Sequence, residues 1–223
     1  PTDRPEDKAV DIAIIGGGMV GLSLATMLAR ANPEWRIVLI EKMAFASLDA
    51  PLTQPSFDAR STAISYGSAE ILQTMGIWES LRPTATAISQ VHVSDRGHFL
   101  GANIGAQEYA LDAVGYVVPN AALGRLLVAE ARAYPNLSLL GDSLVHEVRF
   151  TDKGAELEVN TPAQLTRLQA RLTVIADGGD SPLRTALGIH HHTRDYGQTA
   201  IVCNVSYTEP HKGIAYERFT EQG

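Results

Sequence analysis

The stretch Asp11–Glu41, DIAIIGGGMVGLSLATMLARANPEWRIVLIE, decides the fold of this 223-residue chain. It begins with an apolar strand and continues through the glycine-rich turn Gly16-x-Gly18-x-x-Gly21 into a helix of small residues. A second apolar strand follows and ends in an acid. Strand, glycine turn, helix and acid in this order are typical of the β-α-β unit that binds dinucleotides.

Each glycine of this turn has a physical task beside a dinucleotide. Gly16 permits the tight turn, Gly18 lets the backbone approach a pyrophosphate, and Gly21 lets the helix pack closely on the sheet. The helix N-terminus offers unpaired N–H groups and a partial positive charge to the phosphates. Glu41 can accept hydrogen bonds from a ribose 2′-hydroxyl and disfavours a 2′-phosphate, so we expect FAD or NAD rather than NADP. The alternative interpretation is an ordinary glycine-rich turn.

Composition and charge narrow the class of protein. The net charge of −7, without a Lys/Arg cluster, argues against a nucleic-acid partner. The single cysteine, Cys203, excludes an internal disulfide, and we expect a small buried strand residue there. No apolar run approaches the roughly 20 residues of a membrane-spanning helix. The first ten residues lack the basic start and apolar core of a signal peptide, and we expect a disordered lead-in.

The rest of the chain alternates between predicted helices and strands. A loop rich in Pro, Ala and Ser is predicted over Met43–Phe57, and helices over Ser61–Met75 and Asn120–Ala133. The predicted strands are Ile88–Ser94, Leu137–Leu140, Leu144–Phe150, Glu156–Asn160 and Leu172–Ala176. The third and fourth of these are expected to form a hairpin through the turn Asp152-Lys153-Gly154. The N-terminal unit is therefore interrupted by a segment with the pattern of a separate sheet.

A second turn, residues 176–184 with the sequence ADGGDSPLR, follows the last of these strands. Asp177 can accept hydrogen bonds there, and Ser181 can cap the helix that Pro182 begins. A turn of this kind can pass close to an extended cofactor. The alternative interpretation is a capped turn that binds no ligand.

Together the two motifs resemble the fingerprint of the group A flavoprotein aromatic hydroxylases, which pairs an N-terminal GxGxxG with a later DGxxSxxR. The segments Phe57–Ser61, Val91–His98 and Glu217–Thr220 are similar to the bacterial ubiquinone-biosynthesis branch of that family. The resemblance covers the chain after its first ten residues. It implies FAD as the cofactor and NAD(P)H as a co-substrate.

The resemblance also implies roles for individual residues. Arg60 would lie against the flavin, Arg125 would contact the cofactor, and Val145 would touch the adenine side through its backbone. Asp177 would border the flavin. A surface salt bridge is the alternative for Arg60, and a solvated helix face is the alternative for Arg125. The predicted cofactor-binding residues are Gly16, Gly18, Gly21, Glu41, Arg60, Arg125, Val145 and Asp177.

The fold implied is α/β: a glutathione-reductase-type, Rossmann-like FAD-binding domain with a partial mixed-sheet substrate domain. We expect residues 1–76 and 119–189 to form the FAD-binding domain, and residues 77–118 and 190–223 to belong to the substrate domain. Chains of the family continue beyond the position that Gly223 occupies, to a Gly-Asp-Ala-type motif. We therefore expect these 223 residues alone to bind FAD weakly and to lack hydroxylase activity.

The activity implied is hydroxylation of a polyprenylated phenol, such as 2-octaprenyl-6-methoxyphenol, in ubiquinone biosynthesis. NAD(P)H and O₂ would be consumed through a C4a-hydroperoxyflavin, with no catalytic side chain required. Other ubiquinone-biosynthesis proteins are candidate partners. The expected location is the cytoplasm, with peripheral attachment to the inner membrane implied by the lipid substrate.

Two other functions and one other site stay open at this point. The protein could be a flavin oxidase or dehydrogenase acting on another small substrate, or a non-catalytic flavin-binding subunit of a biosynthetic assembly. A metal site at His190–His192 is disfavoured, because consecutive side chains diverge and do not converge easily on one ion. We also expect His92 and His98 to belong to the substrate-domain sheet rather than to act as acid–base catalysts.

Overall fold

The computed structural model describes residues 8–45 and 54–221. Residues 1–7 of the predicted lead-in and part of the predicted loop over Met43–Phe57 lie outside the described residues. The last three residues of the predicted lead-in, Lys8–Val10, are not disordered, because they begin a strand that pairs with residues 168–170. The chain forms two compact units. The first joins Pro1–Asp58 to Gly124–Ala200, and the second joins Ala59–Leu123 to Ile201–Gly223.

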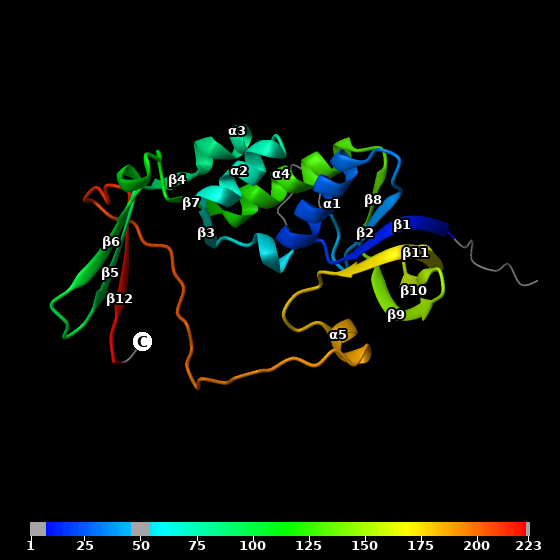
Figure 1. Cartoon of the computed structure of the whole chain (residues 1–223). Coiled ribbons are helices and arrows are strands. Elements are labelled where there is room, and N and C mark those ends of the chain that lie inside the picture. The colour runs from blue at the N-terminus through cyan, green and yellow to red at the C-terminus, as the bar shows by residue number, and fades with distance from the viewer. Residues whose placement is uncertain (1–7, 46–53, 222–223) are drawn as a thin grey trace, which may run out of the picture. The chain divides into compact units, whose positions relative to one another are not determined.

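The first unit is built on a six-stranded sheet with the strand order β8-β2-β1-β11-β10-β9 (Figure 1). The strands β8, β2, β1 and β11 run parallel, while β10 and β9 extend the sheet as an antiparallel hairpin. The bounds are β1 (Lys8–Ile15), β2 (Ile37–Ile40), β8 (Leu137–Leu140), β9 (Leu144–Thr151), β10 (Gly154–Asn160) and β11 (Leu165–Ile175).

Three helices accompany this sheet: α1 (Met19–Ala31), α4 (Asn120–Ala133) and α5 (Pro182–Ala186). Helix α1 packs against β1, β2 and β8 through buried small and apolar residues such as Leu22 and Ala25. Helix α4 crosses the boundary between the units, and its Gly124 lies against the buried ring of Phe57. Within residues 8–45 and 54–221, no helix has the length and apolarity that crossing a membrane requires.

The register of the parallel strands brings their carboxyl ends to one edge of the sheet. Ile15 at the end of β1 pairs with Ile40 of β2 and with Ile175 of β11, and Ile40 pairs with Leu140 of β8. The turns after these four strands therefore emerge side by side. Below them lies a core of buried residues: Ala13, Ile15, Val38, Ile40, Val145, Ala155, Leu157, Val159, Leu168, Ala170 and Leu183.

Asp11 links β1 to the residue that precedes β2. Its Oδ2 accepts the Arg36 backbone N–H at 2.9 Å, and its carboxylate also pairs with the guanidinium groups of Arg36 and Arg171. The Arg36 N–H, assisted by these two cations, holds the pKa of Asp11 below its ordinary value.

The second unit contains two three-stranded sheets, with the orders β3-β7-β4 and β12-β5-β6. The first is antiparallel, and in the second β12 runs parallel to β5. The strands are β3 (Ser61–Ser65), β4 (Thr86–Ile88), β5 (Gln90–Asp95), β6 (Gly101–Gly105), β7 (Gly115–Pro119) and β12 (Ile214–Phe219). The helices are α2 (Tyr66–Thr74) and α3 (Trp78–Leu81), with 3-10 turns at Arg82–Thr84 and Ala106–Tyr109.

The structure confirms the N-terminal β-α-β unit, the hairpin of β9 and β10, and the helix from Asn120 to Ala133. The predicted helix over Ser61–Met75 is wrong in its first five residues, because Ser61–Ser65 pairs with β7 as strand β3 and Ser65 then caps α2. The predicted strand over Ile88–Ser94 is divided between β4 and β5.

Cys203 also departs from the prediction of a buried strand residue. Its thiol is exposed, and residues 198–207 form neither helix nor strand. The apolar side chains of Ile201 and Val205 nearby are exposed as well. No strand of the described residues pairs with this segment, so nothing buries it. The roles predicted for the two segments of each domain stay predictions.

Candidate functional site

The candidate site lies at the carboxyl edge of the parallel strands in the first unit. Gly16 follows β1, Glu41 follows β2, Ser143 lies in the turn after β8, and Asp177 lies in the turn after β11. Ligands of open α/β sheets bind outside the carboxyl ends of the strands, where the connections leave a crevice. The structure therefore brings together residues that the sequence places far apart.

The glycine turn leaves no room for side chains. Gly16 has φ +111°, and a Cβ there would collide with the Ala176 carbonyl group. A Cβ on Gly18 would lie 3.0 Å from the Ser56 Oγ, and one on Gly21 would collide with the Gly16 carbonyl oxygen. Gly16 and Gly21 therefore leave no room for a side chain, as the tight turn predicted for Gly16 and the close helix packing predicted for Gly21 require, whereas at Gly18 only the Ser56 hydroxyl would have to shift.

Helix α1 begins at Met19 directly after this turn. Its N-cap residue is Gly18, no side chain caps the helix, and its first turn contains no acidic residue. The N–H groups of the first turn are thus available to an anion, and the helix dipole adds a partial positive charge there. This is the arrangement that holds phosphates in dinucleotide-binding proteins.

Glu41 ties the turn after β2 to the glycine turn. Its Oε2 accepts the Gly17 N–H at 2.6 Å and its Oε1 accepts the Met43 N–H at 3.0 Å. The residue is only 9% exposed. A carboxylate has about four acceptor sites, so two backbone bonds leave capacity for the predicted ribose hydroxyl. The carboxylate therefore shapes the site as well as lining it.

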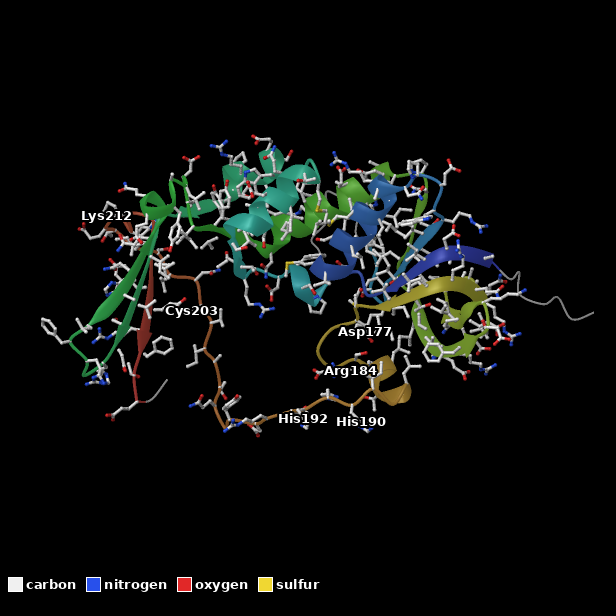
Figure 2. The ribbon with its side chains drawn as sticks, in the orientation of Figure 1. Asp177, Arg184, His190, His192, Cys203 and Lys212 are labelled. Atoms are coloured by element: carbon white, nitrogen blue, oxygen red, sulfur yellow. The ribbon has the colours of Figure 1, made fainter. Side chains whose placement is uncertain are left out.

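The turn between β11 and α5 carries Asp177, and Arg184 lies in α5 (Figure 2). Ser181 is the N-cap of α5, and its Oγ accepts the Arg184 N–H at 3.0 Å. The Arg184 guanidinium donates to the Gly179 carbonyl at 2.6 Å. These bonds hold the bend of the DGGDS segment. Asp177 lies beside the glycine turn because the preceding residue, Ala176, donates its N–H to the Ile15 carbonyl at 2.7 Å.

Two adjoining cavities occupy this edge. The larger, about 300 Å³, is lined by Gly16, Glu41, Val145 and Asp177 among others. The smaller, about 180 Å³, shares Gly16, Glu41 and Asp177 and is lined also by Gly18 and Gln54. The structure thus brings six of the eight predicted residues to one place, with Gly21 behind the turn. Val145 is a buried core residue of β9, and the backbone contact predicted for it stays a prediction.

The two predicted arginines are placed differently. Arg125 is exposed on α4, as the solvated-face alternative requires. Arg60 belongs to the second unit, where it precedes β3 and its carbonyl accepts the Asn120 N–H at 3.0 Å. Their contacts with a cofactor stay predictions.

Gln54 is a site residue that the sequence did not reveal. It is 4% exposed, it lines the smaller cavity, and neither Oε1 nor Nε2 of its side chain has a hydrogen-bond partner among the described residues. A buried amide without partners costs stability, and such a group beside a glycine turn fits a ligand that supplies them. The glycine turn, the uncapped N-terminus of α1 and the amide of Gln54 together fit a dinucleotide.

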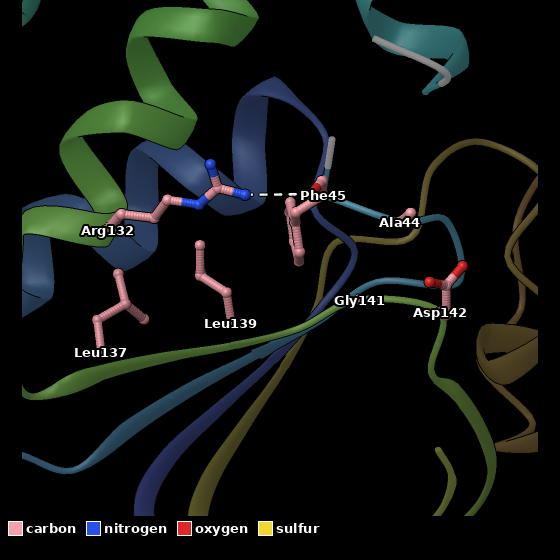
Figure 3. A pocket seen from close by; sticks show the side chains of 7 residues that line it. All are labelled: Ala44, Phe45, Arg132, Leu137, Leu139, Gly141 and Asp142. Atoms are coloured by element: carbon pink, nitrogen blue, oxygen red, sulfur yellow. Dashed lines mark hydrogen bonds between the residues drawn. The ribbon is translucent and has the colours of Figure 1, made fainter. Parts of the chain in front are cut away.

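A further cavity of about 490 Å³ lies along β8 (Figure 3). Leu137, Leu139 and Phe45 line it, and the Arg132 guanidinium donates to the Phe45 carbonyl across its rim at 3.1 Å. The Phe45 ring also lies within 3 Å of where a Cβ on Gly17 would be. Phe45 therefore packs beside the glycine turn, together with Glu41, whose Cβ lies 2.8 Å from the same position.

The histidines of the described residues do not line the two cavities of the candidate site. His190 and His192 are exposed on the extended segment after α5 (Figure 2). Among the described residues, no group of three or more His, Cys, Asp or Glu could hold a metal ion. In β5, His92 Nδ1 lies 2.7 Å from Asn103 Oδ1 of β6, as expected for a residue of this sheet. His98 departs from the expectation, because it lies in the turn between β5 and β6, where it pairs with Asp95.

Comparisons with known proteins agree with this geometry. The model of a family described as FAD binding domain matches residues 9–220. Ubiquinone hydroxylase UbiL of Rhodospirillum rubrum is 32% identical over 100% of this chain and 50% of its own length. Ubiquinone hydroxylase UbiM of Neisseria meningitidis is 30% identical over 94% of this chain and 44% of its own length. The chain thus spans about half the length of these curated relatives.

A solved structure shares the fold. The p-nitrophenol 4-monooxygenase PnpA of Pseudomonas putida superposes with a TM-score of 0.66 and 22% identity. The superposition covers 81% of this chain and 44% of PnpA. At this identity the likeness shows the α/β fold alone.

Proposed function

Because this chain belongs to the FAD binding domain family, we propose that it provides the cofactor site of a flavin-dependent monooxygenase that hydroxylates a polyprenylated phenol in ubiquinone biosynthesis. The single observation that carries the cofactor assignment is the convergence of Gly16, Glu41 and Asp177 on two adjoining cavities beside an uncapped helix N-terminus. The substrate class is taken from the relatives named ubiquinone hydroxylases.

The residues of this chain would divide the work of holding FAD. The N–H groups at the start of α1 would bind the pyrophosphate, because they combine free donors with the positive end of the helix dipole. Glu41 would accept the ribose hydroxyls of the adenosine half, next to the backbone of Val145. Asp177 would lie along the cofactor on the other side of the glycine turn.

Bound FAD supplies the oxidation–reduction chemistry by which a flavoprotein monooxygenase uses NAD(P)H and O₂ to place one oxygen atom on an aromatic ring. This chain contributes binding and orientation, since none of its side chains has to act as a nucleophile or as a metal ligand. A substrate such as 2-octaprenyl-6-methoxyphenol would require an apolar surface for its prenyl tail. We also propose a cytoplasmic protein that attaches peripherally to the inner membrane, and cell fractionation would test this location.

The first test is the visible absorption spectrum of the complete gene product, purified gently, before and after heat releases any bound chromophore. We expect flavin bands and release of FAD. A phenol that then stimulates NAD(P)H oxidation, with one hydroxylated product per NAD(P)H, would support the monooxygenase. A protein that is colourless and does not take up added FAD would contradict the proposal.

The same preparation separates the two alternative functions. A flavin oxidase or dehydrogenase would show flavin reduction by its substrate without any nicotinamide cofactor. A non-catalytic flavin-binding subunit would bind FAD and co-purify with partner proteins but give no turnover with any phenol tested. Stimulated NAD(P)H consumption with hydroxylated product would exclude both alternatives.

A further inference from the structure

We propose that Gln54 is a cofactor-binding residue whose side-chain amide donates a hydrogen bond to the pyrophosphate of the dinucleotide. This inference rests on the proposed function, because it requires FAD at the edge of the sheet. Nothing in the glycine motif or in the DGGDS turn points to a glutamine at this place. The inference follows from the burial of Gln54, from its lack of partners among the described residues, and from its place in the lining of the smaller site cavity.

The backbone holds Gln54 in place. Its carbonyl accepts the Phe57 N–H at 2.9 Å, which closes the 3-10 turn η1 (Pro55–Phe57). Phe57 is 1% exposed, and its ring fills the space beside Gly124 of α4. The turn is thus anchored to the first unit through a buried aromatic ring. Gln54 therefore lies beside the glycine turn because of packing that needs no ligand.

The side chain of Gln54 is buried without any protein partner among the described residues. The residue is 4% exposed, and both Oε1 and Nε2 are inaccessible to solvent and make no hydrogen bond within residues 8–45 and 54–221. An amide in this state forfeits its hydrogen bonds to water and gains none in return. A residue of this kind destabilises the empty protein, which is the pattern expected where a ligand completes the bonding.

The place of Gln54 identifies the part of the ligand. The cavity that Gln54 lines is lined also by Gly16, Gly18, Asp177 and Gly178. Gly18 is the residue whose missing side chain allows a pyrophosphate to come close to the backbone. The phosphate oxygens accept hydrogen bonds and cannot donate them, so the Nε2 of Gln54 would be the group that faces them.

The test compares cofactor binding with the stability of the cofactor-free protein. Gln54→Met keeps the length of the side chain and removes both polar atoms, while Gln73→Met changes an exposed glutamine of α2 and serves as the control. FAD and ADP are titrated separately, because ADP carries the diphosphate without the flavin. Urea unfolding is followed on each cofactor-free protein.

We expect Gln54→Met to weaken both FAD and ADP about ten- to a hundred-fold, the loss that follows removal of a hydrogen bond to a charged group. The urea midpoint of the cofactor-free Gln54→Met protein should stay the same or rise, because an unpartnered buried amide has been removed. Gln54→Glu should weaken both ligands further, since it sets a negative charge against the pyrophosphate. Gln73→Met should change neither ligand affinity nor the urea midpoint.

Three results would overturn the inference. Unchanged FAD and ADP affinities in Gln54→Met would show that the amide makes no contact. A loss confined to FAD would place the contact on the flavin half, and a lowered urea midpoint would reveal a structural partner. If the unaltered protein binds no FAD, the proposed function fails together with this inference, whereas normal binding by both the unaltered and Gln54→Met proteins defeats this inference alone.

Discussion

Replacement of Glu41 by glutamine should destabilise the protein even when no cofactor is present. The carboxylate is 9% exposed and accepts two backbone hydrogen bonds, from Gly17 at 2.6 Å and from Met43 at 3.0 Å. These bonds use both carboxylate oxygens and tie the glycine turn to the turn after β2. A glutamine has one acceptor oxygen and turns an NH₂ donor toward the second backbone N–H, where two donors then face each other.

The cost follows from this geometry. Hydrogen bonds to charged groups contribute about 1.5–3 kcal/mol, against about 0.5–1.5 kcal/mol for neutral ones. One of the two backbone donors would keep a weaker, neutral bond, and the other would lose its partner in a buried place at a cost of about 1–3 kcal/mol. We therefore expect Glu41→Gln to lower the free energy of unfolding by about 2–3 kcal/mol, and Glu41→Ala to lower it by a similar or larger amount.

Urea unfolding of the cofactor-free protein, followed by tryptophan fluorescence, measures this difference. Glu34→Gln is the matched control, because Glu34 is exposed in the segment between α1 and β2. The control should differ from the unaltered protein by less than about 0.5 kcal/mol. If Glu41→Gln unfolds at the same urea concentration as the control yet loses FAD, the carboxylate acts through the ribose alone, and the structural argument is refuted.

Three further predictions concern packing and pH. Gly21→Ala should displace α1 from the sheet, because its Cβ would meet a carbonyl oxygen of the glycine turn, and isothermal titration should show greatly weakened FAD binding. Gly124→Ala should destabilise the protein by about 1–3 kcal/mol in urea, since its Cβ would enter the rigid ring of Phe57, and a cost near zero would contradict the packing described. Asp11→Asn should lower the urea midpoint at neutral pH, because the Arg36 N–H holds the pKa of this carboxyl below 3.8. The ionised carboxyl stabilises the fold above its unfolded-state pKa, so the difference between the two proteins should shrink as the pH falls below 3.8 and protonation removes that contribution.

The N-terminal β-α-β unit could be predicted closely because its signals are local. The glycine turn, the small-residue helix and the terminal acid lie within one stretch of sequence, and each follows from simple steric and electrostatic rules. The same holds for Ser181, whose cap of α5 depends only on residues three positions apart.

Strand β3 could not be predicted in this way. Its residues, Ser61–Ser65, carry no strong strand preference, and they form a strand because they pair with β7, from which a long stretch of chain separates them. The first half of β11 could not be predicted for a similar reason. Its apolar residues, Leu165, Leu168 and Ala170, follow no strict alternation, and the segment forms a strand because it pairs with β10 and β1.

Gln54 shows where sequence analysis of the site stops. It lies in a stretch rich in Pro, Ala and Ser, a glutamine carries no motif, and its burial depends on the anchoring of Phe57 by α4. For Cys203 the sequence predicted a buried strand residue, but the structure exposes it. No strand of the described residues pairs with the segment around it. In both cases the decisive fact is a contact between distant segments, or its lack within the part of the chain that the structure describes.

The pairing of β1 with β11 also sets the order in which the site can form during synthesis. Lys8 pairs with Leu168 and Ile15 with Ile175. Strand β1, which precedes the glycine turn, is therefore synthesised long before β11, which precedes the turn with Asp177. In the nascent chain, the edge of β1 that pairs with β11 stays unpaired until β11 has been synthesised. Such distant pairing slows folding, because the chain loses the entropy of a long loop before the contacts between the two strands stabilise it. We therefore expect nascent chains stalled before β11 to be sensitive to protease and to lack cofactor, and chains stalled well after α5 to gain protection.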